Sequence, residues 1–541
     1  MGVIVESPQF WKLREIVNKN RYIRNCYHSA VMFCVVALAA CTVNPVTGQS
    51  EIELVSTAQQ IQIGQQQYVP AQQMQGGQYK VDPALSEYVA GVGARLAAQS
   101  PAKLPYEFVV LNNSVPNAWA LPGGKIAINR GLLVELRNEA ELAAVLGHEI
   151  VHAAARHGAK SMERGLLLQS AVMATQIGTD RVPLGDTLVR SVQTGASLIN
   201  QKYGRDAERE SDFYGTRYLA QAGYDPYAAV TLQETFVRLS QGGGGAAQQR
   251  SWMDGLFASH PPSEERVTNN RGLVEQLREE GYRDGEYGAD RYQAAIRTIK
   301  TDAPAYAQLD LARQAVFEGD YAEAVGHVEQ AIAAQNEEAQ FHAMRGEIRA
   351  RQGRYQDAIT NFDRALARDP EFFSFHLGRG MANARLDRSE EAQQDLNRSL
   401  QLLPTTIAYL ELGKVAESQG NLEAAARYYE AAGQSPGEIG QEARSSLLRV
   451  DLPNRPERYL SSQTGVGEDG RWLLRVINNS PVAVTSVRVR VDYIDAGGST
   501  RRFERTIDKL EPGKYRQLQF PREAGSVQRA RAEVIAATPT R

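Results

Sequence analysis

Residues 142–157 read Leu-Ala-Ala-Val-Leu-Gly-His-Glu-Ile-Val-His-Ala-Ala-Ala-Arg-His. His148 and His152 are four residues apart, so a helix places both imidazoles on one face, within reach of one metal ion. Glu149 lies beside them, where it can accept a proton from a water molecule that zinc activates. The apolar residues before His148 favour a buried helix over two ordinary histidines on a solvated face. The stretch therefore predicts a zinc hydrolase with His148 and His152 as ligands and Glu149 as general base.

A catalytic zinc site needs three protein ligands and one open position, so a third ligand must come from elsewhere. The predicted helix 206–222 contains Glu208 and Asp212, which share one face. That spacing suits a ligand at Glu208 and an outer carboxylate at Asp212 that holds a ligand imidazole. A solvated acidic face explains the spacing equally well, and Glu210 is the alternative ligand. His157 is rejected as a ligand because a continuous helix turns it away from the face of His152.

The three cysteines all lie in the first 41 residues, so a disulfide framework and cysteine ligands to zinc are excluded beyond Cys41. Basic residues at 12–24 and an apolar run at 30–40 precede Cys41, and the run is too short to span a bilayer. The sequence Leu-Ala-Ala-Cys resembles a bacterial lipobox, with an ordinary signal peptide or a buried helix as the alternatives. We therefore expect lipidation of Cys41 and a place in the periplasm of a Gram-negative bacterium, on the outer membrane.

The 541 residues predict a multidomain chain. The net charge of −3 gives no global basic field, so nucleic acid is not an expected partner. The expected parts are a signal segment (1–41), a tether (42–59), a metalloprotease domain (60–295), tetratricopeptide repeats (303–450) and a small β-domain (455–541).

Inside the metalloprotease domain we expect mainly helices with a small sheet. Residues 56–100 are typical of helix, 107–111 of a strand, and 118–130 of two extended segments around a turn at 121–124. Helices are expected over 138–163 and 165–199, and the four glycines at 242–245 predict a flexible loop.

A repeat begins near residue 303. The pattern Gly-Asp-Tyr-Ala-Glu-Ala at residue 319 recurs at 353 and, more weakly, at 387 and 420. This period matches the roughly 34 residues of a tetratricopeptide repeat and predicts an α-solenoid. Glycines at 346, 380 and 413 stand where two helices of a unit must approach closely. Beyond residue 452 the period changes to two, which predicts a small β-sandwich.

Three segments together resemble one protease superfamily: residues 142–157, Glu208 to Asp212, and Asn117-Ala-Trp-Ala-Leu-Pro-Gly-Gly124. They are similar to the gluzincin superfamily of CAAX prenyl proteases, HtpX and BepA, over about residues 60–271. The resemblance implies that Glu208 binds zinc and that Asp212 supports a ligand. Ser211, where the family often has Ala, is a mild departure. The lack of membrane helices points to the periplasmic branch, part of which also carries tetratricopeptide repeats, whereas the C-terminal β-domain departs from it.

Two further roles follow from this resemblance. The segment Ser259-His260-Pro261, with Arg266 after it, matches a His-Pro segment near the metal, so His260 is expected to be a gate or a transition-state contact, and Arg266 an outer partner. A capping or core histidine is the alternative. The resemblance also places a substrate-pairing strand at Lys125, Ile126, Ala127 and Ile128, which suits extended, unfolded chains.

Two functions fit the sequence. One is a zinc endopeptidase that acts on misfolded or stalled envelope proteins, with repeats that bind substrates or outer-membrane assembly machinery. The other is a chaperone-like adaptor whose protease site is latent.

Overall fold

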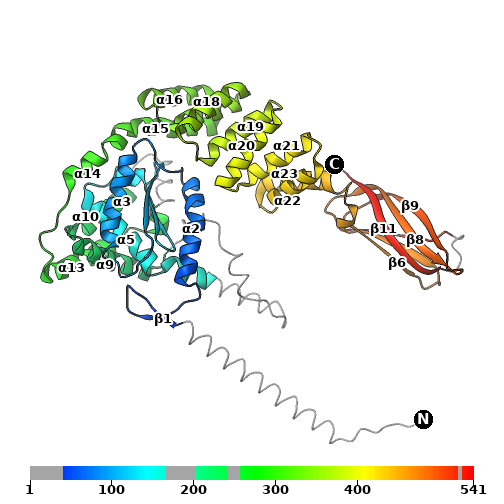
Figure 1. Cartoon of the computed structure of the whole chain (residues 1–541), viewed down its shortest axis with the longest axis horizontal. Coiled ribbons are helices and arrows are strands. Elements are labelled where there is room, and N and C mark those ends of the chain that lie inside the picture. The colour runs from blue at the N-terminus through cyan, green and yellow to red at the C-terminus, as the bar shows by residue number, and fades with distance from the viewer. Residues whose placement is uncertain (1–40, 166–202, 242–255, 522–526, 541) are drawn as a thin grey trace, which may run out of the picture. The chain divides into compact units, whose positions relative to one another are not determined.

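The computed structural model describes residues 41–165, 203–241, 256–521 and 527–540, and the chain divides into two compact units, 1–306 and 307–541 (Figure 1). Residues 1–40 of the predicted signal segment, most of the predicted helix 165–199 and the glycine run 242–245 lie outside the described residues. None of the described helices is both long enough and apolar enough to cross a bilayer.

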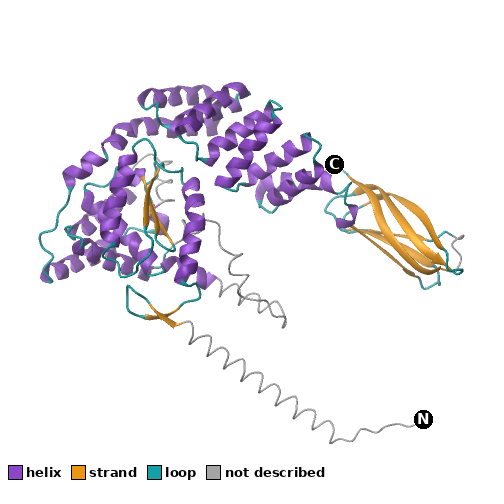
Figure 2. Cartoon of the chain, in the orientation of Figure 1, coloured by secondary structure: helices purple, strands orange, loops and turns teal. Residues whose placement is uncertain are grey.

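The first unit is mainly helical, as the sequence predicts (Figure 2). Its strands are β1 (Cys41–Val43), β2 (Ser50–Ile52), β3 (Glu107–Leu111), β4 (Ala118–Leu121) and β5 (Lys125–Asn129). Its helices are α2 (Thr57–Met74), α3 (Pro83–Ala97), α4 (Arg130–Leu133), α5 (Glu139–Ala154), α9 (Arg205–Gln221), α10 (Tyr227–Gln241), α12 (Leu256–Ser259), α13 (Glu264–Glu279) and α14 (Ala289–Ala295).

The small sheet of this unit has the strand order β3-β5-β4, with β5 parallel to β3 and antiparallel to β4. The prediction that residues Lys125 to Ile128 pair with a substrate is therefore wrong. They form β5, the central strand, whose backbone is paired on both sides, and all of its side chains are buried. An added strand needs a free edge, and β5 has none. The turn between β4 and β5 places Gly123 and Gly124 in the left-handed region, as a tight hairpin requires.

Helix α5, which carries His148 and His152, is buried along its whole length. Its first turn is fixed by side chains from three other segments. Asn138 caps the helix by accepting from the amide of Glu141, and Glu139 accepts from Tyr88, Tyr224 and Arg291. These hydrogen bonds anchor the first turn of the helix to the surrounding segments.

The prediction of one continuous helix over residues 138–163 is wrong near Arg156. α5 ends at Ala154, Arg156 adopts φ +63°, and helix resumes over residues 157–165. A left-handed arginine costs about 1 kcal/mol or more, so it needs compensating contacts. The buried guanidinium supplies them, because it donates to the carbonyl of Val55 and to Glu163.

Residues 41–55, predicted as part of a tether, fold into the β1–β2 hairpin and pack on this break. The Asn44 side chain donates to the carbonyl of Ala155 over 3.3 Å, and Lys160 pairs with Glu51 at 2.6 Å. Glu163 accepts from the amides of Leu54 and Val55. The segment after Cys41 is thus attached to the end of α5.

Helices α5 and α9 cross at two glycines. A Cβ atom on Gly215 would lie 2.9 Å from the amide nitrogen of His148, and one on Gly147 would lie 3.0 Å from the carbonyl oxygen of Gly215. Both contacts are with backbone, which cannot swing aside as a side chain can. The two backbones therefore touch next to His148.

The second unit begins with paired helices: α15 (Arg297–Glu318, which starts in the first unit), α16 (Tyr321–Ala334), α17 (Ala339–Arg351), α18 (Tyr355–Arg368), α19 (Phe373–Arg385), α20 (Ser389–Leu402), α21 (Thr406–Ser418), α22 (Leu422–Gly433) and α23 (Gly437–Asp451). The predicted solenoid is confirmed. Gly346 and Gly380 leave room for the side chains of Phe362 and Leu396, and Gly413 does so for Tyr429.

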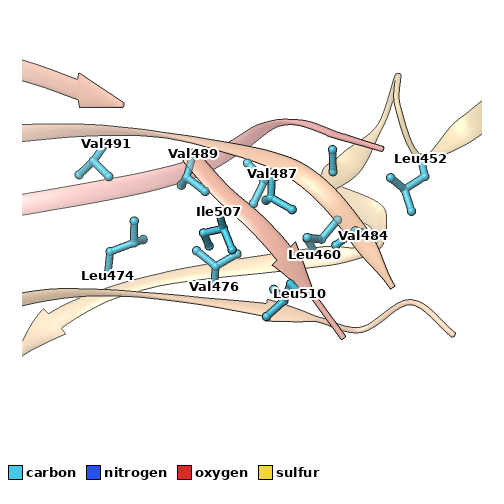
Figure 3. Close-up of a cluster of buried hydrophobic side chains, with 12 residues drawn as sticks. Leu452, Leu460, Leu474, Val476, Val484, Val487, Val489, Val491, Ile507 and Leu510 are labelled. Carbon is cyan, nitrogen blue, oxygen red and sulfur yellow. The ribbon is translucent and has the colours of Figure 1, made fainter. Parts of the chain in front are cut away.

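The chain ends in a β-sandwich, as predicted. Its strands are β6 (Leu460–Val466), β7 (Trp472–Asn478), β8 (Val484–Asp495), β9 (Thr500–Leu510), β10 (Tyr515–Gln519) and β11 (Val527–Pro539), with a short 3-10 helix at Pro456–Arg458. They form two sheets, β10-β7-β6 and β11-β8-β9. Alternate residues of β8 point inward onto Leu474 and Val476 of β7, so aliphatic side chains of both sheets fill the interior (Figure 3).

The glycine crossing predicts the effect of one methyl group. We expect Gly215→Ala to lower the free energy of unfolding by about 1–3 kcal/mol, because the two helix backbones must move apart. Gly272→Ala in α13 is the matched control, since nothing lies within 4 Å of its added Cβ. It should instead stabilise by about 0.5–1 kcal/mol. Calorimetric unfolding measures both variants. Equal stability of Gly215→Ala and the wild type would contradict this packing.

Candidate metal centre

Four buried side chains meet at one point: His148 and His152 from α5, Glu208 from α9, and His260 directly after α12. One potential ligand atom from each lies within 4.8 Å of all the others. His148 Nε2 is 3.0 Å from His152 Nε2 and 3.2 Å from His260 Nδ1. Glu208 carboxylate oxygens lie 3.3 Å from His152 Nε2 and 3.1 Å from His260 Nδ1. Such a group could hold a metal ion.

The predicted partners Asp212 and Arg266 lie directly behind this cluster. Asp212 Oδ1 is 3.0 Å from His148 Nδ1, the ring nitrogen that faces away from the cluster. Arg266 donates to both oxygens of Asp212 at 2.7 Å, a bidentate pair. It also approaches Glu208 at 3.2 Å and donates to the carbonyl of Pro261. One guanidinium thus connects two carboxylates with the segment that carries His260.

The pKa values of the carboxyl groups around the cluster are shifted in different directions. Burial opposes ionisation of Glu208, yet the neighbouring His260 and His148 hold the pKa of Glu208 well below 4.5. Burial also opposes ionisation of Asp212, but Arg266 holds the pKa of Asp212 below its ordinary value. The pKa of Glu149 is raised, because burial outweighs the attraction of His260 and His148. A carboxylate that binds a proton more readily is suited to transfer protons.

The two carboxylate oxygens of Glu149 differ in their contacts. Its Oε1 lies 3.4 Å from His260 Nε2. Its Oε2 is buried and has no hydrogen-bond partner in the described part of the chain. A buried carboxylate oxygen without a partner is costly and is a common feature of reactive sites.

His260 is held by backbone contacts of a short segment. Its amide donates to the carbonyl of Leu256, and the amide of Leu256 donates to the carbonyl of Pro116, just before β4. A cavity at the cluster is lined by His148, Glu149 and His260 and also by apolar residues such as Phe236.

Tyr203 is a residue of this site that the sequence analysis missed. Its ring stacks on His152, with centroids 3.9 Å apart and planes 25° apart. Nothing in the local sequence marked Tyr203, because it belongs to the segment just before α9 and reaches His152 only in the folded chain.

The other predicted residues lie apart from the cluster. Lys125 pairs with Glu107 within the sheet, and Cys41 begins β1. Glu210, the alternative ligand, contacts His157 at 3.3 Å and not the four-residue cluster. His157 itself lies behind His152.

Known proteins resemble two regions of the chain. Residues 83–274 match the model of Peptidase family M48, and residues 309–360, 344–405 and 388–439 match a tetratricopeptide repeat model.

Three relatives show how far the likeness extends. A putative beta-barrel assembly-enhancing protease of Vibrio cholerae is 31% identical over 36% of this chain and 40% of its own length. The beta-barrel assembly-enhancing protease of Escherichia coli K12 is 28% identical over 47% of this chain and 51% of its own. Metalloprotease YcaL of Escherichia coli K12 is 33% identical over 31% and 63%.

The chain spans about half or less of the two assembly-enhancing proteases that it matches. The match to the peptidase model contains His148, His152, Glu208 and His260. The chain therefore carries a Peptidase family M48 domain followed by tetratricopeptide repeats.

Proposed function

We propose that this protein is a zinc-dependent endopeptidase of the bacterial cell envelope. The observation that carries the proposal is the buried cluster of three imidazoles and one carboxylate, with Glu149 beside it, inside an M48 domain. A tetrahedral zinc with bonds of 2.0–2.1 Å places its ligands about 3.3 Å apart. The contacts between ligand atoms, 3.0–3.5 Å, fit that spacing.

The four residues of the cluster would hold zinc, which when bound would act as a Lewis acid on the scissile carbonyl and would activate water. Glu149 takes the proton of the attacking water, because its buried Oε2 has no hydrogen-bond partner among the described residues. The same carboxyl group then gives the proton to the leaving amine. Asp212 fixes His148 by accepting from its Nδ1, and Arg266 holds Asp212.

His260 occupies the fourth position of the cluster. A catalytic site keeps that position open, whereas a closed four-ligand site is typical of structural zinc. We therefore assign His260 the role of a gate that holds the site latent at rest. A transition-state contact is the alternative role, and its Nε2 near Glu149 favours that alternative.

Substrates are proposed to be unfolded or misassembled chains. In the described structure β4 is an edge strand, paired only with β5, and it follows the Pro116 contact of the His260 segment. An extended peptide can add to such an edge through backbone hydrogen bonds, which do not depend on one sequence.

The setting is proposed from the sequence and from the relatives. Two relatives are called beta-barrel assembly-enhancing proteases, which supports a role on misfolded or stalled outer-membrane and periplasmic proteins. The repeats provide a surface for substrates or for assembly machinery. The lipobox-like sequence at Cys41 supports a lipid anchor in the outer membrane, facing the periplasm. A chaperone-like adaptor with a latent site is the second candidate, favoured by the four-residue closure of the cluster.

The role of Glu149 separates the two candidates. Glu149→Gln keeps the shape of the side chain and removes the base, so we expect casein cleavage to fall by about 10²–10⁴-fold. Bound zinc, measured by mass spectrometry, should stay at one per chain. Cleavage at the wild-type rate would contradict the endopeptidase mechanism, and full complementation of a deletion strain by Glu149→Gln would favour the adaptor.

Glu149 also sets a pH dependence. The base must be ionised, and its pKa is raised by burial, so activity is lost as the pH falls through that raised value. We expect the acidic limb of the kcat/KM profile to lie above pH 4.5, the ordinary pKa of a glutamate. A profile that stays flat down to pH 4.5 in protein that retains its zinc would contradict this assignment.

The two roles of His260 predict opposite results for His260→Ala. A gate predicts faster casein cleavage, by about tenfold for each 1.4 kcal/mol of preference for the closed state. A transition-state contact predicts a loss of about 10²–10³-fold. Initial rates at saturating casein, with zinc content measured in parallel, distinguish them.

A further inference from the structure

His157 and Glu210 form a second pair behind the cluster that the mechanism above does not use. His157 is 5% exposed and is the first residue of the helical segment after the break at Arg156. Its Nδ1 lies 2.9 Å from His152 Nδ1, and its Nε2 lies 3.3 Å from Glu210 Oε1. Two imidazoles and a carboxylate therefore form a line that ends at the cluster.

The contacts of His152 determine which of its two ring nitrogens carries the proton. Its Nε2 faces the other ligand atoms, 3.0 Å from His148 Nε2 and 3.3 Å from Glu208 Oε1. A metal ligand nitrogen carries no proton, and a neutral imidazole has one N–H, which must then be on Nδ1. That N–H points at His157 Nδ1.

The proton of His157 follows from the same reasoning. Because its Nδ1 accepts from His152, its own N–H is on Nε2 and donates to Glu210. Ser211 Oγ also approaches His157 Nδ1, but at 3.5 Å it is farther than His152. On the proposed metal site, we propose that His157 and Glu210 are positioning residues that fix the tautomer and ring orientation of the metal ligand His152.

The two histidine ligands of α5 are thus held differently. His148 donates directly to Asp212, whose charge is matched by Arg266. His152 donates to a neutral imidazole, and the charge of Glu210 is one ring farther away. A third carboxylate in direct contact with His152 would place more negative charge beside Glu208 and Asp212. His157 accepts the hydrogen bond from His152 without adding charge.

The break at Arg156 makes this arrangement possible. In one continuous helix, a residue five positions on is rotated by about 140° from the face of His152. The left-handed turn at Arg156 redirects the chain so that the ring of His157 returns toward that of His152, with centroids 4.9 Å apart.

Zinc affinity tests the proposal with a readout other than proteolysis. Removing an outer partner of a ligand typically weakens metal binding by 10–100-fold. We expect His157→Phe to raise the Kd for zinc, measured by competition with a chromogenic chelator, by about that factor. Glu210→Gln should raise the Kd less, because its amide oxygen still accepts. Glu265→Gln is the matched control: it removes an exposed carboxylate that pairs with Arg209 and should leave the Kd unchanged.

A second measurement covers a His157→Phe protein that fails to fold. In wild-type, zinc-loaded protein with ¹⁵N-labelled histidine, two-bond ¹H–¹⁵N correlations report which ring nitrogen carries the proton. We expect Nδ1–H on His152 and Nε2–H on His157. When His157→Phe does fold, His157→Gln, which retains an acceptor, should bind zinc more tightly than His157→Phe.

Two results overturn the proposal while leaving the metal site intact: a proton on Nδ1 of His157, or unchanged zinc affinity in both His157→Phe and Glu210→Gln. Wild-type protein that binds no zinc would contradict the metal site itself, and this proposal with it.

Discussion

The close crossing of α5 and α9 at Gly147 and Gly215 is the contact on which the metal centre depends. Because neither residue has a Cβ, the helix backbones touch at His148. The ligand Glu208 and the outer carboxylate Asp212 lie on α9, about two turns and one turn before the crossing, respectively. Any larger residue at the crossing separates the two halves of the cluster. A glycine in a helix interior costs about 0.5–1 kcal/mol, and here that cost is offset by the geometry it permits.

Charge balance is the second constraint. The pKa of Glu208 and that of Asp212 are held below their ordinary values against the effect of burial, and Arg266 contacts both carboxylates. Glu149 responds to the same burial by binding a proton more readily. A cation between Glu208 and the imidazoles relieves the remaining negative charge, which is why the donor set suits a divalent metal. Arg266 also contacts the carbonyl of Pro261, so the metal centre and the His260 segment share one residue.

Much of this arrangement was predictable from the sequence. The four-residue spacings placed His148 with His152 and Glu208 with Asp212, and the 34-residue period gave the solenoid. The period of two beyond residue 452 predicted the β-sandwich. The order of strands in the small sheet was not predictable, because a strand pattern does not name the neighbours of the strand. The family resemblance placed the substrate-pairing strand at residues 125–128, which form the central strand β5.

The break at Arg156 was not predictable either. Arginine is a good helix former, and its left-handed conformation is stabilised by Glu163, which follows the break, and by the carbonyl of Val55, which is distant in sequence. The same holds for Tyr203, which reaches His152 through tertiary packing. His157 was rejected as a ligand on the assumption of a continuous helix, whereas the break brings its ring into contact with His152 Nδ1.

The central claim is that α5, α9 and the His260 segment together bind one zinc ion through nitrogen and oxygen. X-ray absorption at the zinc edge of the purified chain tests it most directly. The account predicts one zinc per chain with a shell of three imidazole nitrogens and one carboxylate oxygen at about 2.0–2.2 Å. A sulfur neighbour at about 2.3 Å, or protein that takes up no zinc, would contradict it.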